Sequence, residues 1–199
     1  MVCMVIGLDG ATWNNLGPWI RSGYLPTFKR ILSEGVHGSL QSTIPSITQV
    51  ALATFITGKN PGKTGIYAST KADGSVINFN DIKEEPFWNL MGHKKSCIVN
   101  LRMTYPPKKL NGVLISGDLL TPSEDSNYTY PKKLKKEVKG FHSNNRTLLT
   151  LSSGAKANKK HIFDLLVATT KFRYQIFKNL VMNDHYDFSI FWISQTDYL

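Results

Sequence analysis

The sequence is poor in cysteine and contains no long apolar segment. Its two cysteines, Cys3 and Cys97, each lie in an apolar, strand-like run, which predicts small buried thiols in a reducing compartment and no disulfide. No run approaches the roughly 18 apolar residues that a membrane helix needs. The first residues also lack a charged leader followed by a cleavable apolar segment. We therefore expect a cytoplasmic protein without a membrane span.

Acidic residues are too few to balance the basic ones. The chain has 24 lysines and arginines against 14 aspartates and glutamates, a net charge of +10. The excess lies in residues 128–178, whose acidic side chains are Glu137 and Asp164. Two interpretations stay open, a solvated basic face or an electropositive rim that attracts phosphorylated substrates or an anionic surface. Nucleic-acid binding is disfavoured, because aromatic residues are not interleaved with the basic cluster.

Hydrophobic periodicity predicts an alternation of strands and helices. Expected strands cover residues 2–8, 36–42, 75–80 (in a hairpin), 96–100, 112–116 and 187–194. Expected helices cover residues 12–22, 26–34, 48–57, 86–92, 131–138 and 159–183. Such alternation is typical of an α/β fold with a mostly parallel sheet covered by helices, and 41% apolar residues can supply its core. A polar linker is expected over residues 140–158, before the last long helix.

A hydroxyl is expected at the start of the helix at 48–57. Pro45 ends the preceding extended segment, Ser46 or Thr48 can cap the helix, and Gly58 ends it. Thr48 would lie in the first turn, where free amides and the helix dipole favour an anion. A threonine becomes a nucleophile only with help from a metal ion or a neighbouring base.

The first expected strand ends in a carboxylate, Asp9, followed by Gly10. Ligands of open α/β sheets bind at the carboxyl ends of strands. A lone carboxylate there is a common ligand of a hard cation.

The strand that ends at Asp9-Gly10 and the helix that starts near Thr48 together resemble the type I phosphodiesterase and nucleotide pyrophosphatase family of the alkaline phosphatase superfamily. The resemblance covers residues 1–140 and 186–199. The matching motifs are Leu8-Asp9-Gly10, Pro45-Ser46-Ile47-Thr48, residues 57–67, Thr104-Tyr105-Pro106-Pro107, residues 115–122 and Tyr130-Pro131.

The resemblance implies an alkaline-phosphatase-like three-layer sandwich, truncated at its C-terminal side, with an inserted basic helical cap. The core would comprise residues 1–127 and 186–199, and the cap residues 128–185. The missing strands would leave an exposed sheet edge through which the chain could self-associate.

The family binds two divalent metal ions, usually zinc, with manganese as an alternative. By the family pattern, Asp9 and Thr48 would bind one ion, and Asp197 would bind the other. The pattern Asp-x-x-x-His places its histidine two positions beyond Leu199, so the metal site would be incomplete in this chain. Asp184-His185 imitates a later family motif, but Tyr186 follows it, and a turn is the expected structure.

Family phosphodiesterases often hold a phosphate oxygen with an asparagine after the Gly-Ile turn, where this chain has Ala68-Ser69-Thr70. The amide of Thr48 or Gln49 is then expected to stabilise the transition state. Asn100, at the end of a strand, is either a substrate ligand or a structural residue.

The predicted function is a metal-dependent phosphoesterase with Thr48 as its nucleophile, acting on a phosphorylated small molecule, with nucleotides as one candidate. The alternative is a catalytically incomplete α/β module that binds phosphate or a partner chain. Sulfatase chemistry would need a Cys/Ser-x-Pro-x-Arg motif, which Thr48 and its neighbours do not match. Residues 58–64 resemble a phosphate-binding P-loop, but they are one residue short and follow a helix.

Overall fold

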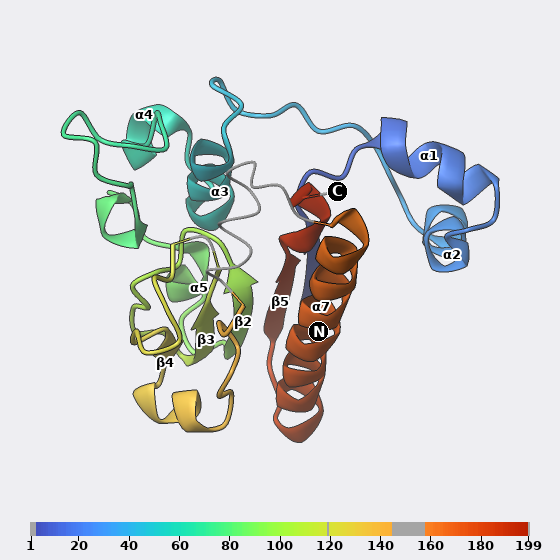
Figure 1. The fold of residues 1–199 in the computed structure, drawn as a ribbon. Helices are drawn as coiled ribbons and strands as arrows, with labels where there is room; N and C mark the ends of the chain where they lie inside the picture. The colour runs from blue at the N-terminus through green and yellow to red at the C-terminus, as the bar shows by residue number, and fades with distance from the viewer. Residues whose placement is uncertain (1–2, 119, 145–157, 199) are drawn as a thin grey trace.

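The computed structural model describes residues 3–118, 120–144 and 158–198 (Figure 1). Its centre is a five-stranded sheet whose strands run in the order β1 (Cys3–Leu8), β5 (Phe188–Ile193), β2 (Ser96–Leu101), β3 (Gly112–Ser116) and β4 (Thr129–Tyr130). The first four strands are parallel to their neighbours, and β4 pairs antiparallel with β3. The predicted α/β class with a mostly parallel sheet is confirmed. All four parallel strands consequently end at one edge of the sheet.

Two apolar clusters cover the two faces of the sheet. Successive residues of β2 alternate between them, because side chains along a strand point to opposite faces. Ile98 packs in the cluster that includes α3 (Thr48–Thr57), whereas Val99 packs in the cluster that includes α7 (Lys159–Asn183). The α3 residues in the first cluster are Val50, Leu52, Ala53 and Ile56. The sheet is therefore buried between helices, as a three-layer sandwich requires.

A helical hairpin stands apart from these layers (Figure 1). It consists of α1 (Trp13–Arg21) and α2 (Pro26–Glu34), which contact each other. Thr12 caps α1 by accepting a hydrogen bond from the amide of Asn15, and Pro26 opens α2 with its fixed backbone angle. No residue of α2 is buried. Local signals thus form both helices, although neither contributes much to the core.

Three expected elements differ in the structure. Residues 36–42 form no strand, no strand of the described sheet pairs with them, and the side chains of Val36 and Leu40 are exposed. The expected hairpin strand at 75–80 is reduced to one bridge between Thr70 and Val76, followed by a short 3-10 helix η1 (Phe79–Asp81). The helix expected at 131–138 is a 3-10 helix, η2 (Lys132–Lys136). The remaining short helices are α4 (Pro61–Thr64), α5 (Phe87–Leu90) and η3 (Gln195–Tyr198).

The described part of the segment expected as a cap, residues 128–185, packs against the sheet. β4 is a strand of the sheet, and α7 lies against β2 and β5. Leu134 and Phe177 belong to the same buried cluster as Val99. Where the structure describes them, these elements form part of the core layers, because their apolar sides cover the sheet while their lysines remain exposed. Residues 145–157 of the expected linker lie outside the described residues.

The two cysteines lie in different environments. Cys97 is buried in the sheet, where burial raises the pKa of its thiol to about 12. Cys3 is exposed, which corrects the expectation of two buried thiols. The reason is the strand order, since β1 is an edge strand whose Met4 and Ile6 are also about half exposed. Within the described residues, no helix is both long and apolar enough to span a membrane.

Candidate active site at the carboxyl edge of the sheet

Charged and polar side chains follow each of the four parallel strands where they end. Asp9 follows β1, Asp197 lies in η3 just after β5, and Arg102 follows β2. Asp118 follows β3. Segments far apart in the sequence therefore meet at one edge, where α/β sheets bind their ligands.

A cavity of about 560 Å³ opens beside this edge. Asp9, Thr48 and Asp197 all line it, together with Ser46 and Trp192. The three residues to which the family resemblance assigned metal binding are thus brought together. Gln49 and Asn100 are not among the lining residues.

Thr48 is the first residue of α3, and its side chain is partly exposed. The residue that caps the helix is Ile47, which has no side-chain oxygen, and neither Ser46 nor Thr48 caps it as expected. The first amide to bond back within the helix is that of Ala51, to the carbonyl of Ile47 (2.9 Å). The amides of the first turn thus have no intrahelical partner and favour an anion. Among the described residues, the Thr48 hydroxyl has no hydrogen-bond partner either.

Asp9 is held by contacts from three other segments. Its Oδ2 accepts a hydrogen bond from Arg102 Nη1 (2.6 Å) and a longer one from Trp192 Nε1 (3.4 Å). Its carbonyl accepts a hydrogen bond from the Thr196 hydroxyl (2.6 Å). Burial raises the pKa of Asp9 above its ordinary value, although the Arg102 guanidinium opposes this shift. Asp9 is consequently fixed in position with one carboxylate oxygen already bound.

Asp197 is more exposed, with 43% of its side-chain surface accessible. Its Oδ2 lies 3.4 Å from Nη1 of Arg102, the same nitrogen that binds Asp9. Gly10 allows Asp197 to lie close to the backbone after β1, because a Cβ at Gly10 would lie 3.0 Å from Asp197 Oδ1. Gly10 also has a φ of +70°, a conformation that residues with a side chain rarely adopt.

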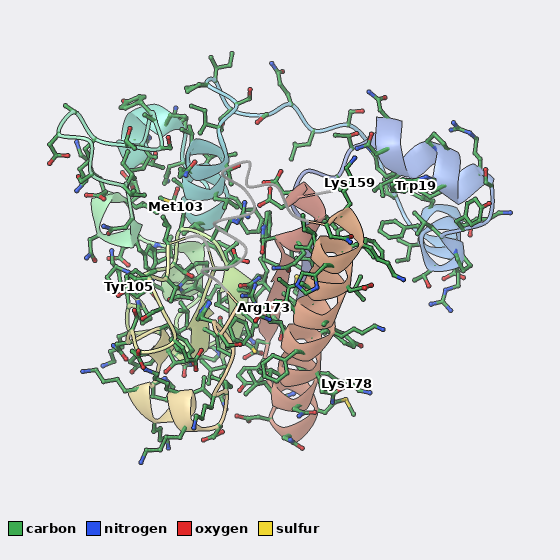
Figure 2. The ribbon with its side chains drawn as sticks, in the orientation of Figure 1. Trp19, Met103, Tyr105, Lys159, Arg173 and Lys178 are labelled. Carbon is green, nitrogen blue, oxygen red and sulfur yellow. The ribbon has the colours of Figure 1, made fainter. Side chains whose placement is uncertain are left out.

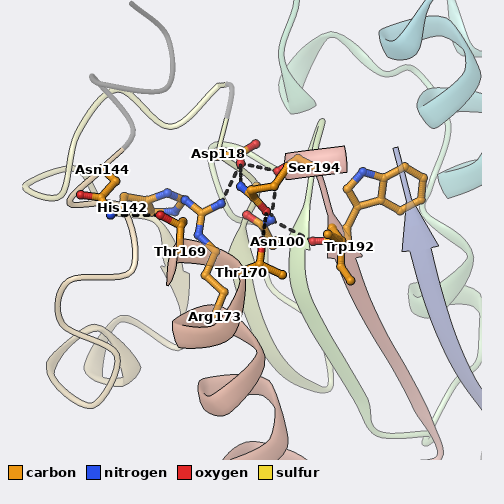
Figure 3. A network of polar contacts seen from close by, with 12 residues as sticks. Asn100, Asp118, His142, Asn144, Thr169, Thr170, Arg173, Trp192 and Ser194 are labelled. Carbon is orange, nitrogen blue, oxygen red and sulfur yellow. Dashed lines mark hydrogen bonds and ion pairs between the residues drawn. The ribbon is translucent and has the colours of Figure 1, made fainter. Parts of the chain in front are cut away.

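Asp118 pairs with Arg102 as well, and Figure 3 shows it facing Arg173 and Ser194. Its Oδ1 lies 3.3 Å from Arg102 Nε, and its Oδ2 lies 2.7 Å from Nη1 of Arg173, which projects from α7. Oδ2 also accepts hydrogen bonds from Ser194 and from Gln195 Nε2 (3.1 Å). Burial by itself would raise the pKa of Asp118, but the two guanidinium groups and the Ser194 hydroxyl lower it below its ordinary value. Asp118 is therefore a buried, ionised carboxylate.

Sequence reasoning assigned no role to Arg102, Asp118 or Arg173. Asp118 lies within the family motif at residues 115–122. It also follows an apolar strand, as Asp9 does, and this pattern is the signal that could have identified it. Arg102 and Arg173 carried no such signal, because their pairing depends on strand order and on the placement of α7.

Asn100 lies inside the sheet and has a φ of +61°. Its Nδ2 donates to the Trp192 carbonyl (2.9 Å) and to Ser194 Oγ (3.4 Å), which connects β2 to β5 (Figure 3). Its buried Oδ1 has no partner among the described residues. These contacts agree with the structural alternative for Asn100, and its role as a substrate ligand stays a prediction.

The expected metal ions can be tested against the donor atoms at this edge. Asp9, Asp197 and Thr48 offer oxygen atoms alone, whereas protein zinc sites normally include nitrogen or sulfur ligands. Within the described ranges, no group of three or more histidine, cysteine, aspartate or glutamate residues is arranged to hold a metal ion. Arg102 already bridges the two carboxylates. The described residues therefore do not fit a zinc site on their own.

Comparison with known proteins gives one match. The sequence model of the family described as type I phosphodiesterase / nucleotide pyrophosphatase matches residues 3–199. Searches of curated proteins and of solved structures give no match. Proteins of this family are generally metal-dependent and act on phosphorylated substrates. The match confirms the family predicted from the motifs, and the chain belongs to the type I phosphodiesterase and nucleotide pyrophosphatase family.

Proposed function

We propose that this protein hydrolyses phosphoric esters and that Thr48 is the nucleophile. The observation that carries the proposal is the position of the Thr48 hydroxyl. It lies at the start of α3, lines the same cavity as Asp9 and Asp197, and has no hydrogen-bond partner among the described residues. Family membership supports the reaction class.

The proposed reaction has two steps. First, the Thr48 oxygen forms a bond to phosphorus while the bond to the leaving oxygen breaks, giving a phosphothreonine. Water then attacks phosphorus and releases phosphate or a phosphomonoester, which restores the hydroxyl. The amides of the first turn of α3 are placed to bind phosphate oxygens. Asp9 and Asp197 supply the carboxylate oxygens of the cavity that can accept the hydroxyl proton.

The proposal also includes the two divalent ions expected from the family, zinc or manganese. Asp9 and Thr48 would contribute to one site and Asp197 to the other. Because the described residues do not fit such ions on their own, we assign no step of the reaction to them. The proposed substrate is a phosphorylated small molecule, with nucleotides as one candidate.

Self-association is a further part of the proposal. The outer side of β1 is a sheet edge, and Met4 and Ile6 on this strand are about half exposed. An exposed edge with apolar side chains is a template for pairing with a second chain.

The test is hydrolysis of p-nitrophenyl phosphate and bis-p-nitrophenyl phosphate by the full chain with added zinc or manganese. Thr48→Ala should reduce turnover to background. Thr54→Ala is the matched control, because Thr54 lies on the same helix and its buried hydroxyl has no partner among the described residues. Thr54→Ala should retain activity, and Thr48→Ser should retain part of it.

Two outcomes would contradict the proposal. Equal turnover by Thr48→Ala and the unmodified chain would exclude Thr48 as the nucleophile. No turnover by the unmodified chain would favour the alternative, a catalytically incomplete α/β module. The ion pairs that Arg102 already forms with Asp9 and Asp197 are the observation that favours this alternative.

A further inference from the structure

The strongest feature outside the proposed reaction is the position of Arg102. Its guanidinium contacts both carboxylates that the family pattern assigns to metal ions. Nη1 lies 2.6 Å from Asp9 Oδ2 and 3.4 Å from Asp197 Oδ2. The side chains of Arg102 and Asp9 are only 4% and 10% exposed, so that solvent screens their contact weakly, whereas Asp197 is 43% exposed.

Arg102 is held in this position from behind. Its Nε faces Asp118, which is itself fixed by Arg173 and Gln195. The backbone around Arg102 is also unusual, because Asn100 and Met103 both have positive φ angles, of 61° and 66°. Residues other than glycine adopt such angles rarely, and only where the surrounding structure fixes them. The ion pair with Asp118 and the local backbone conformation therefore hold Arg102 at the carboxyl edge of the sheet.

A metal ion and this guanidinium would compete for the same oxygen. An ion bound to Asp9 Oδ2 would lie about 2.0–2.6 Å from it, which is the space that Nη1 now takes. The two cations would also repel each other strongly in a buried site. Both could not bind Oδ2 from the same side at once.

We propose that Arg102 is the resident cation of Asp9 and Asp197, and that these carboxylates bind divalent ions only when Arg102 is displaced. Their oxygen donors favour a hard ion such as Mn²⁺ over zinc. This inference concerns binding to the carboxylates and does not depend on Thr48 being the nucleophile. The two proposals can therefore fail separately.

The experiment measures Mn²⁺ binding to the full chain by isothermal titration calorimetry. Arg102→Met removes the charge with little change in size, and the variant should bind Mn²⁺ at least about tenfold more tightly than the unmodified chain. Arg102→Lys keeps a cation and should bind no more tightly than the unmodified chain. Adding Asp9→Asn to Arg102→Met should abolish the gain.

Lys71→Met is the matched control for the loss of a charge. Lys71 pairs with Asp81 (2.6 Å) in an exposed ion pair distant in sequence from the edge. It should leave Mn²⁺ binding unchanged. Two results would overturn the proposal. One is tight Mn²⁺ binding by the unmodified chain that Asp9→Asn abolishes. The other is a folded Arg102→Met variant without any gain in affinity.

The proposal can be tested even if Arg102→Met does not fold. If Arg102→Met lacks its native circular dichroism spectrum, Mn²⁺ is added while the spectrum is followed. The ion should restore folding, because it replaces the lost positive charge and binds the native state. Failure of millimolar Mn²⁺ to restore the spectrum, with Arg102→Lys folded, would also overturn the proposal.

Discussion

The carboxyl edge of the sheet and the α1–α2 hairpin differ in which side chains they bury. At the edge, the buried charges that follow β1, β2 and β3 are paired with one another and with Arg173 of α7. In the hairpin, large apolar side chains are exposed, with Trp19 at 53% and Ile31 at 56%. Figure 2 labels Trp19 on α1. The edge thus buries polar groups, whereas the hairpin exposes apolar ones, the reverse of the usual distribution.

This difference indicates where stability and specificity lie. A buried charge is tolerated only if its partners remain in place, so that the edge depends on the whole fold. The hairpin depends on its own cap, its proline and the contact between its two helices. Regions with few buried contacts open at low free-energy cost. We therefore expect perturbations at the edge to be global and those in the hairpin to remain local.

The largest effect is expected from Asp118→Ala. This change leaves the buried guanidinium groups of Arg102 and Arg173 without their shared carboxylate, and it should lower the free energy of unfolding by about 3–5 kcal/mol. Urea denaturation followed by circular dichroism measures the loss. Glu34→Ala, at the end of α2, is the control and should change stability by less than about 0.5 kcal/mol. Equal effects of the two changes would remove the contrast between the regions.

A smaller, pH-dependent effect is expected at Glu124, behind the edge. Burial by itself would raise its pKa, but hydrogen bonds from the Tyr128 hydroxyl and from the amides of Gly140 and His142 lower it below the ordinary value. The ionised form is therefore favoured in the folded state. Its contribution to stability is complete above the ordinary pKa and is lost as the pH falls through the lowered one.

The test compares Glu124→Gln with the unmodified chain in urea at neutral and acidic pH. Glu124→Gln should be less stable at pH near 7, and the two denaturation midpoints should converge as the pH falls below 4.5, the ordinary value. A difference in midpoint that stays constant with pH would contradict an ionised Glu124 as the cause.

The smallest effects are expected in the hairpin. Trp19→Ala and Ile31→Ala each remove a side chain that is more than half exposed, and each should lower global stability by less than about 1 kcal/mol. Urea denaturation at two protein concentrations measures this. A larger loss that grows with concentration would mean that the hairpin is covered by a second copy in solution, and the comparison with the edge would need revision.

The fold was largely predictable because its signals are local. The apolar runs of β1, β2, β3 and β5, the start of α3 at Thr48 and the length of α7 agree with the expected elements. The strand expected at 36–42 is wrong, because a strand-like sequence needs a neighbour with which to pair. The division into a core and a cap at 128–185 stays a prediction, whereas the packing of α7 against β2 and β5 could not be read from local patterns.

The candidate site was also predictable from the sequence only in part. Asp9, Thr48 and Asp197 were named from motifs, and the structure places all three on one cavity, although their roles remain predictions. Gln49 and Asn100 do not line it. The pairing of Arg102 and Arg173 with Asp118 had no local signal, although Asp118 itself follows an apolar strand, because an ion pair between distant residues has no signature in periodicity or spacing.

The sequence by itself determined the alternating elements, the family and the hydroxyl at the start of α3, because these follow from local patterns and motifs. Only the tertiary structure decided which charges meet. The strand order places β5 between β1 and β2, and this puts Arg102 within reach of both Asp9 and Asp197. The physical reason is that parallel strands align their carboxyl ends at one edge, while their order across the sheet depends on how the whole chain packs.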